Sequence, residues 1–99
     1  MEGVKAMAGF LGGSAFAMSR DVGEGYHTVT ARTFVGMTSS QLDQLAAELD
    51  KVLREVRGTQ PALDDMTAVQ KRNRKISRLN NALMILRTYR NNSRRLVRR

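Results

Sequence analysis

The chain has 99 residues and a formal net charge of +8, with 17 Lys and Arg against nine Asp and Glu. This length and a hydrophobic content of 41% suffice for one small core, so we predict a single domain over residues 1–99. With no cysteine and one histidine, the sequence excludes disulfides, a cysteine nucleophile and a multi-histidine metal site within one chain. No apolar run reaches the roughly 18–20 residues that cross a bilayer.

The first third of the chain predicts an apolar arm and a β-hairpin over residues 1–36. Small apolar residues fill positions 3–18, and the glycines among them disfavour a helix by about 1 kcal/mol each relative to Ala. Turn-forming residues follow at 21–25. The alternating, β-branched and aromatic sequence of residues 26–35 predicts a strand, with residues 14–19 as its partner. Whether residues 3–18 form an arm, a strand or a helix stays open.

An amphipathic helix is predicted over residues 39–57, within a segment at 38–58. Thr38 and Gln41 have the spacing of a capping box, and Met37 and Leu42 are placed to form a hydrophobic staple around it. Apolar residues then recur at helical spacing. We expect Gly58 to follow the last turn in the left-handed conformation that commonly ends a helix.

A second, longer helix is predicted over residues 61–91, within a segment at 60–92, and an Arg-rich tail follows at 93–99. Pro61 suits a first helical turn, and no later Gly or Pro interrupts the pattern. At 1.5 Å per residue this helix is about 45 Å long, against about 28 Å for the first. The predicted fold class is mainly α with a small β element (α+β), in which the N-terminal hairpin or arm precedes an antiparallel helical hairpin.

The apolar residues at 82–86 surround the second helix on all sides, which predicts that the helix is covered on all sides there. Either a second copy of the chain or its own N-terminal arm could cover this collar. We favour a homodimer, because one copy of so short a chain has little other surface to offer. The expected interface consists of Ile76, Leu79, Leu83, Ile85 and Leu86.

Charge divides the chain into two unlike parts. Residues 1–65 carry six Lys and Arg and all nine acidic residues, a net charge of −3, whereas residues 66–99 carry eleven Lys and Arg and no acidic residue, a net charge of +11. Such asymmetry is typical of proteins that bind nucleic acid or an anionic surface. A merely solvated helix face would normally contain acidic partners at i,i+4.

The cations recur at helical spacing, which predicts two stripes that track phosphates. Arginine suits this role because its planar guanidinium binds phosphate oxygens in pairs. The expected nucleic-acid-binding residues are Lys71, Arg72, Arg74, Lys75, Arg78, Arg87, Arg90, Arg94, Arg95 and Arg98. Asparagines lie among them; asparagine can read adenine but is more often an ordinary surface residue. With only five aromatic residues in the chain, base stacking on a single strand is disfavoured, and a duplex or a folded RNA is expected.

These observations predict a small nucleic-acid-binding protein that contacts phosphates, largely tolerates sequence, and is located in the cytoplasm or within a nucleoprotein particle. Two alternatives stay open: a structural assembly subunit of a virion or ribonucleoprotein, and a peripheral membrane protein. An enzyme is not expected, because His27, with Tyr26, Asp21 and Glu24 nearby, lacks a nucleophile and a recognisable catalytic arrangement. We predict no catalytic residue, metal site or cofactor.

Overall fold

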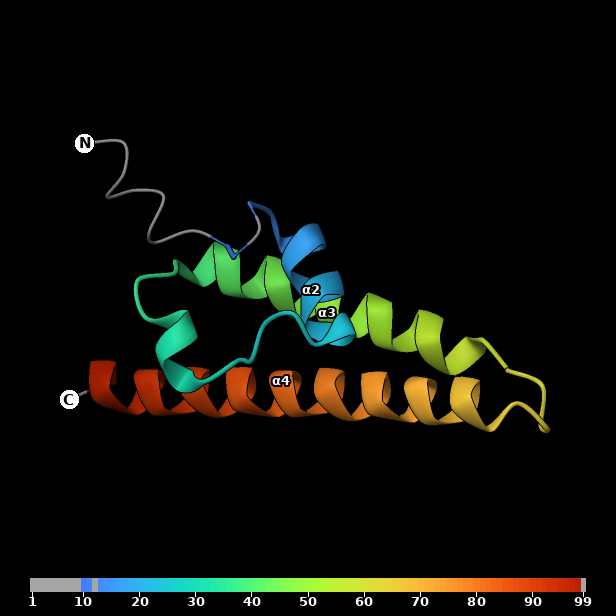
Figure 1. Ribbon diagram of the computed structural model, residues 1–99. Coiled ribbons are helices and arrows are strands. Elements are labelled where there is room, and N and C mark those ends of the chain that lie inside the picture. Colours follow the sequence, from blue (N-terminus) through green and yellow to red (C-terminus); the bar gives the residue numbers. More distant parts are fainter. Residues whose placement is uncertain (1–9, 12, 99) are drawn as a thin grey trace.

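The computed structural model describes residues 10, 11 and 13–98, with side chains as far as Asn92. Its elements in chain order are α2 (Ala15–Glu24), the 3-10 helix η1 (Ala31–Phe34), α3 (Ser39–Gly58) and α4 (Met66–Arg98). Helices α3 and α4 run antiparallel, and α2 and η1 lie on the same side of α4 as α3 (Figure 1). In the described part of the chain, no helix combines the length and hydrophobicity that a membrane span requires.

The prediction of a β-hairpin was wrong, because the described residues contain no strand. The segment assigned as the first strand, residues 14–19, provides the N-cap and first turn of α2. The segment assigned as the second, residues 26–35, is irregular up to Thr30 and then forms η1. Val29 and Phe34 would occupy opposite faces of a strand, yet both are buried in one helical core. Burial of both side chains against helices therefore outweighs the local β-propensity. Residues 1–9 and 12, part of the predicted arm, lie outside the described residues.

Helix α2 occupies a segment in which the sequence suggested an arm and a turn. At its start the Ala17 amide donates to Ser14 Oγ at 3.0 Å, which caps the first turn. At its end Gly25 adopts a φ of 89°, and the amides of Gly25 and Tyr26 donate to the carbonyls of Val22 and Asp21. This pair of hydrogen bonds is the Schellman motif, so Gly25 forms the turn and residues 21–24 belong to the helix.

Helix α3 begins where the sequence predicts and ends differently. The capping box is confirmed: the Gln41 amide donates to Thr38 Oγ1 at 3.1 Å, and the Thr38 amide donates to Gln41 Oε1 at 2.8 Å. The expectation for Gly58 was wrong. Gly58 is the last helical residue and is not among the glycines with positive φ, and Thr59 follows it in extended conformation.

Helix α4 begins later and extends further than predicted. The carboxylate of Asp65 accepts a hydrogen bond of 3.0 Å from the Ala68 amide, so Asp65 caps the helix and Pro61 lies in the preceding connection. The helix continues to Arg98, so the backbone of residues 93–98 is helical rather than a separate tail. With 33 residues, α4 is longer than the 20-residue α3 that packs against it, and its C-terminal half extends past the start of α3 (Figure 1).

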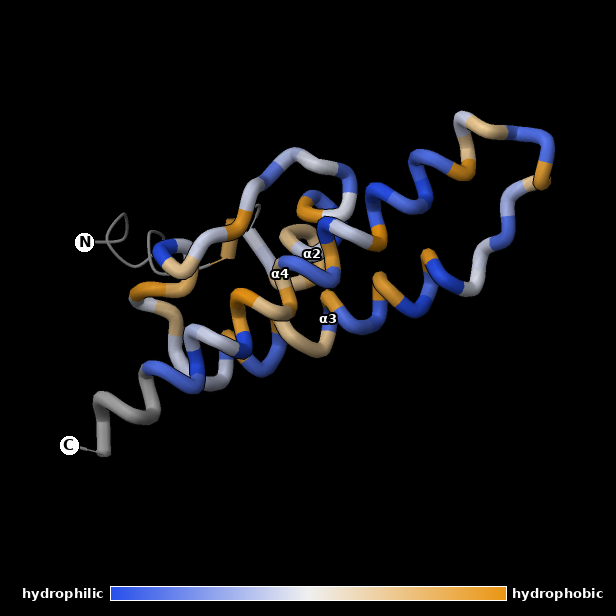
Figure 2. Tube along the Cα trace, turned by 90° about the horizontal axis from the view of Figure 1, so that it is seen from below, coloured by the Kyte–Doolittle hydropathy of each residue, from blue (hydrophilic) through white to orange (hydrophobic). Residues whose placement is uncertain are grey.

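One hydrophobic core joins all of these elements. Hydrophobic segments of α3 and α4 face one another along the helical pair in Figure 2. In the collar of α4, Ala82, Leu83 and Leu86 are buried in this core and Ile85 is partly buried against it; one to two turns earlier, Leu79 is buried and Ile76 partly buried. Met84 is 62% exposed, so the collar is covered on one side and open on the other.

The residues predicted as a dimer interface therefore belong to the core of a single chain. The Phe34 ring, from the segment that follows α2, lies 5.7 Å from the ring of Tyr89 on α4. The chain thus covers one side of its own collar, with residues of α2, η1 and α3, and Met84 lies on the open side. Coverage of the collar consequently provides no argument for a second copy, and the homodimer stays a prediction.

Candidate nucleic-acid interface

Helix α4 has one long side that no other described element covers. Helices α2, η1 and α3 all pack against its opposite side (Figure 1). We call the uncovered side the outer face; its exposed residues are Gln70, Lys71, Asn73, Arg74, Ser77, Asn80, Asn81, Met84, Arg87, Thr88 and Asn91, with Lys71 at the edge nearest α2 and α3. Because residues 66–99 contain no acidic residue, the outer face is polar and cationic without any carboxylate of its own helix.

Arg72, one of the predicted phosphate ligands, instead caps α3. Its Nε donates to the carbonyl of Thr59 at 2.9 Å and to that of Val56 at 3.3 Å, and its Nη2 donates to the carbonyl of Arg57 at 3.0 Å. The carbonyls at a helix C-terminus lack partners within the helix and carry partial negative charge, which a cation stabilises. Arg72 therefore supplies the cap that Gly58 does not provide.

The end of α2 holds two more of the predicted cations. Arg78 Nη1 donates to the Gly23 carbonyl at 2.9 Å, and Lys75 Nζ lies 2.8 Å from Glu24 Oε2. Both side chains therefore point from α4 back towards α2. They anchor α2 on α4 and are only partly available to an external anion.

Arg90 is also directed towards the protein. Its guanidinium forms an ion pair with Asp43 and lies within hydrogen-bonding distance of Ser39 Oγ, both in the first turns of α3. The Arg90 side chain is only 23% exposed. It joins the second half of α4 to the start of α3.

Three of the predicted cations are exposed and have no polar partner among the described residues. Lys71, Arg74 and Arg87 are exposed and form no hydrogen bond or ion pair with another described residue. The remaining three predicted residues, Arg94, Arg95 and Arg98, lie on the helical backbone of α4, but their side chains lie outside the described residues.

A groove of about 570 Å³ lies between the first half of α4 and the ends of α2 and α3. Five cations and one carboxylate, Glu24, contribute to its lining; the cations are Lys71, Arg72, Arg74, Lys75 and Arg78. Two helix C-termini meet here, and two of the five cations, Arg72 and Arg78, donate to their backbone carbonyls. Lys75 pairs with Glu24, which leaves Lys71 and Arg74 as the lining cations without a polar partner among the described residues.

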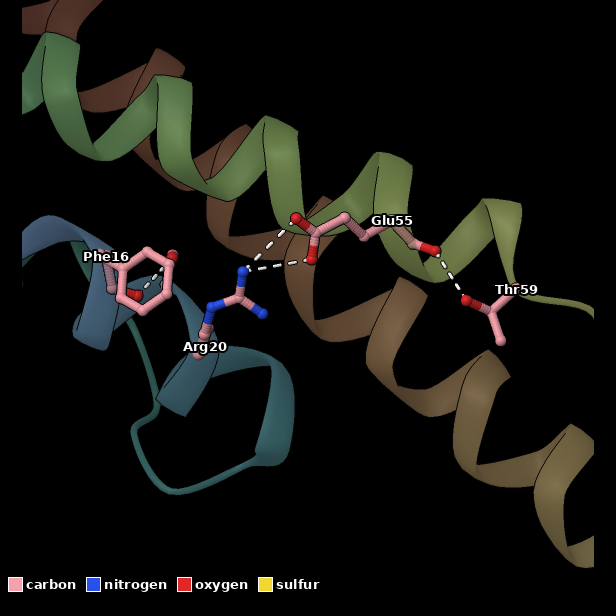
Figure 3. A network of polar contacts seen from close by, with 5 residues as sticks. Phe16, Arg20, Glu55 and Thr59 are labelled. Carbon is pink, nitrogen blue, oxygen red and sulfur yellow. Dashed lines mark hydrogen bonds and ion pairs between the residues drawn. The ribbon is translucent and has the colours of Figure 1, made fainter.

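An ion pair between α2 and α3, which the sequence did not predict, joins Arg20 to Glu55. Arg20 Nη2 lies 3.2 Å and 3.4 Å from the two carboxylate oxygens of Glu55, and its Cζ lies 4.4 Å from the centre of the Phe16 ring (Figure 3). Thr59 Oγ1 donates to the Glu55 carbonyl at 3.0 Å. This network positions α2 beside the last turns of α3, where the groove is formed. No local sequence signal identifies it, because Arg20 and Glu55 are 35 residues apart.

No protein-family model, curated protein sequence or solved structure matches this chain. The fold and the site together define its class: a small helical protein whose long C-terminal helix presents an uncovered, acid-free face.

Proposed function

We propose that this protein binds nucleic acid by contacting phosphates through the outer face of α4. The observation that carries the proposal is that Lys71, Arg74 and Arg87 are exposed, form no ion pair with another described residue, and lie on a helix whose sequence contains no acidic residue. Phosphate diesters are the anions that such a face would attract at neutral pH in a cell, and arginine binds them through paired N–H groups.

The spacing of these cations favours a polyanion over a small anion. Arg74 and Arg87 are thirteen residues apart, which corresponds to about 20 Å along a helix. A single small anion cannot contact both, whereas an extended nucleic acid presents phosphates continuously over such a length. The binding surface is therefore the length of the outer face rather than the groove alone.

Four of the ten predicted phosphate ligands are bonded within the protein, and the proposal does not count them as ligands. Arg72 and Arg90 are directed into the protein, and Lys75 and Arg78 are held by the end of α2. If the three exposed cations each neutralise one phosphate, the log–log salt dependence of the binding constant has a slope of about −2.7 on duplex DNA. A slope shallower than about −2 would contradict binding through phosphates.

The decisive experiment compares two triple charge reversals of equal composition. Lys71→Glu, Arg74→Glu and Arg87→Glu alter the outer face, and Lys51→Glu, Arg54→Glu and Arg57→Glu alter exposed cations of α3. Binding to a fluorescein-labelled duplex DNA is measured by anisotropy, and folding by circular dichroism. We expect the outer-face variant to lose about a hundredfold in affinity and the α3 variant to lose less than about tenfold, because only the former removes direct phosphate contacts. Equal losses would show that net charge alone attracts the nucleic acid and would overturn the proposed site.

A further inference from the structure

The middle of the outer face is uncharged. Between Arg74 and Arg87 the exposed residues are Ser77, Arg78, Asn80, Asn81 and Met84, and Arg78 turns back to the Gly23 carbonyl. At 100° per residue the other four side chains fall within an arc of about 100° of the helix circumference. The two asparagine amides form no hydrogen bond with another described residue, so their donors and acceptors are open to a ligand.

The two arginines flank this uncharged centre diagonally. The same helical arithmetic places Arg74 beyond one edge of the arc and Arg87 beyond the other, at opposite ends of the stretch. A helix that lies in a groove between the two phosphate backbones of a duplex needs one cation for each backbone. These two cations must lie on opposite edges of the helix face and at opposite ends of the contact. The outer face has this arrangement.

The width of the α4 outer face selects between the two common duplexes. An α-helix with its side chains is about 10–12 Å across, and the major groove of B-DNA, about 12 Å wide, admits it. The major groove of A-form RNA is too narrow for side chains to read. We infer that the outer face of α4 enters the major groove of duplex DNA, where Asn80 and Asn81 face base edges while Arg74 and Arg87 contact the phosphates of opposite strands.

The central side chains match the edges of A·T pairs. The carboxamide of an asparagine accepts a hydrogen bond from adenine N6 and donates one to N7, and an apolar group packs against the thymine methyl. Asn80 and Asn81 supply the amides, and the exposed Met84 supplies the apolar contact. This inference rests on the proposed function, to which it adds a preference for A·T pairs in duplex DNA.

The test measures anisotropy of the full chain with three duplexes of equal length: A·T-rich DNA, G·C-rich DNA, and RNA of the A·U-rich sequence. We expect the wild type to bind the A·T-rich DNA about tenfold more tightly than either of the others. The double variant Asn80→Ala, Asn81→Ala should lose this preference and keep its affinity for G·C-rich DNA within about twofold. A second adjacent and exposed pair on the same helix provides the matched control, because Asn91→Ala, Asn92→Ala lies outside the central stretch and should retain the preference.

The outcomes separate this inference from the proposed function. If the three duplexes bind equally, or the RNA binds as tightly as the A·T-rich DNA, or Asn80→Ala, Asn81→Ala changes nothing, the inference is overturned. Should the outer-face charge reversal still abolish binding in that case, the proposed function stands. If the wild type binds none of the duplexes, the proposed function itself fails and the inference fails with it.

Discussion

The guanidinium of Arg78 on α4 lies directly against Gly25, the glycine that follows the last residue of α2. A Cβ atom placed on Gly25 would lie 3.0 Å from Arg78 Cζ, while Arg78 Nη1 donates to the Gly23 carbonyl at 2.9 Å. The turn that ends α2 therefore packs against a side chain of α4, which is distant in the sequence. This contact helps to hold α2 over the apolar residues of α4 that it covers.

Replacing Gly25 by alanine should destabilise the protein. Gly25 has a φ of 89°, a conformation that costs a residue with a Cβ about 1–2 kcal/mol, and the new methyl group would also displace Arg78. We expect Gly25→Ala to lower the free energy of unfolding by about 1–3 kcal/mol in urea titrations. Gly58→Ala is the matched control: Gly58 is helical with nothing within 4 Å of its added Cβ, so stability should stay equal or rise by up to about 1 kcal/mol. Equal losses in the two variants would contradict the fit between Arg78 and Gly25.

Arg72 and Lys71 are neighbours in sequence, but substitution of Arg72 should mainly lower stability and substitution of Lys71 should mainly lower the affinity for DNA. Arg72→Met removes the three hydrogen bonds to the carbonyls of α3 and keeps most of the aliphatic stem, so stability should fall by about 1–3 kcal/mol. Lys71→Met should change stability by less than about 0.5 kcal/mol, since Lys71 is exposed and unpaired among the described residues. Affinity for duplex DNA should fall more for Lys71→Met than for Arg72→Met. Urea denaturation and anisotropy on the same two proteins measure both effects, and the reverse order of affinities would return Arg72 to the phosphate-binding surface.

The features that the sequence predicts correctly depend on partners close in the chain. The capping box of α3 joins Thr38 to Gln41, three residues away, so the pattern contains both partners. The β-hairpin failed because alternation in residues 26–35 is a local signal, whereas the environment of Phe34 is not local: its ring packs near Tyr89. Helix α2 also has local signals, the Ser14 cap and the Gly25 stop. From the sequence alone, the glycines in and around this segment instead favour an arm and a turn.

The candidate site shows the same division. Sequence predicts that the last third of the chain is cationic and helical, and α4 agrees. It cannot predict which cations the protein itself uses, because Arg78 and Arg90 bind partners 55 and 47 residues away. Only the folded structure, in which Arg78 and Arg90 reach these distant partners, separates the cations that the protein itself uses from those exposed on the outer face.

Leu79 should be among the most costly positions of α4 to truncate. Its side chain is fully buried and lies against Gly23 of α2, so Leu79→Ala should leave a cavity and lower the free energy of unfolding by about 2–5 kcal/mol. Met84, 62% exposed on the same helix, should tolerate alanine with a loss below about 0.5 kcal/mol. Thermal denaturation at two protein concentrations measures both variants and the wild type. A wild-type midpoint that rises with concentration would show that contacts between copies stabilise the folded state.

Glu24 should weaken nucleic-acid binding in the wild type. Its carboxylate lies 2.8 Å from Lys75 Nζ and lines the groove beside Lys71 and Arg74, so it competes with a phosphate for Lys75 and repels the anion. We expect Glu24→Gln to tighten binding to duplex DNA about two- to fivefold at low salt and to steepen the log–log salt slope by up to about 0.9, the value for one more phosphate contact. Asp50→Asn provides the matched control, because the Asp50 carboxylate is as exposed as that of Glu24 and pairs with Arg54 on α3. If both variants tighten binding equally, the effect belongs to net charge, and if Glu24→Gln weakens binding, Lys75 depends on Glu24 to be positioned for the phosphate.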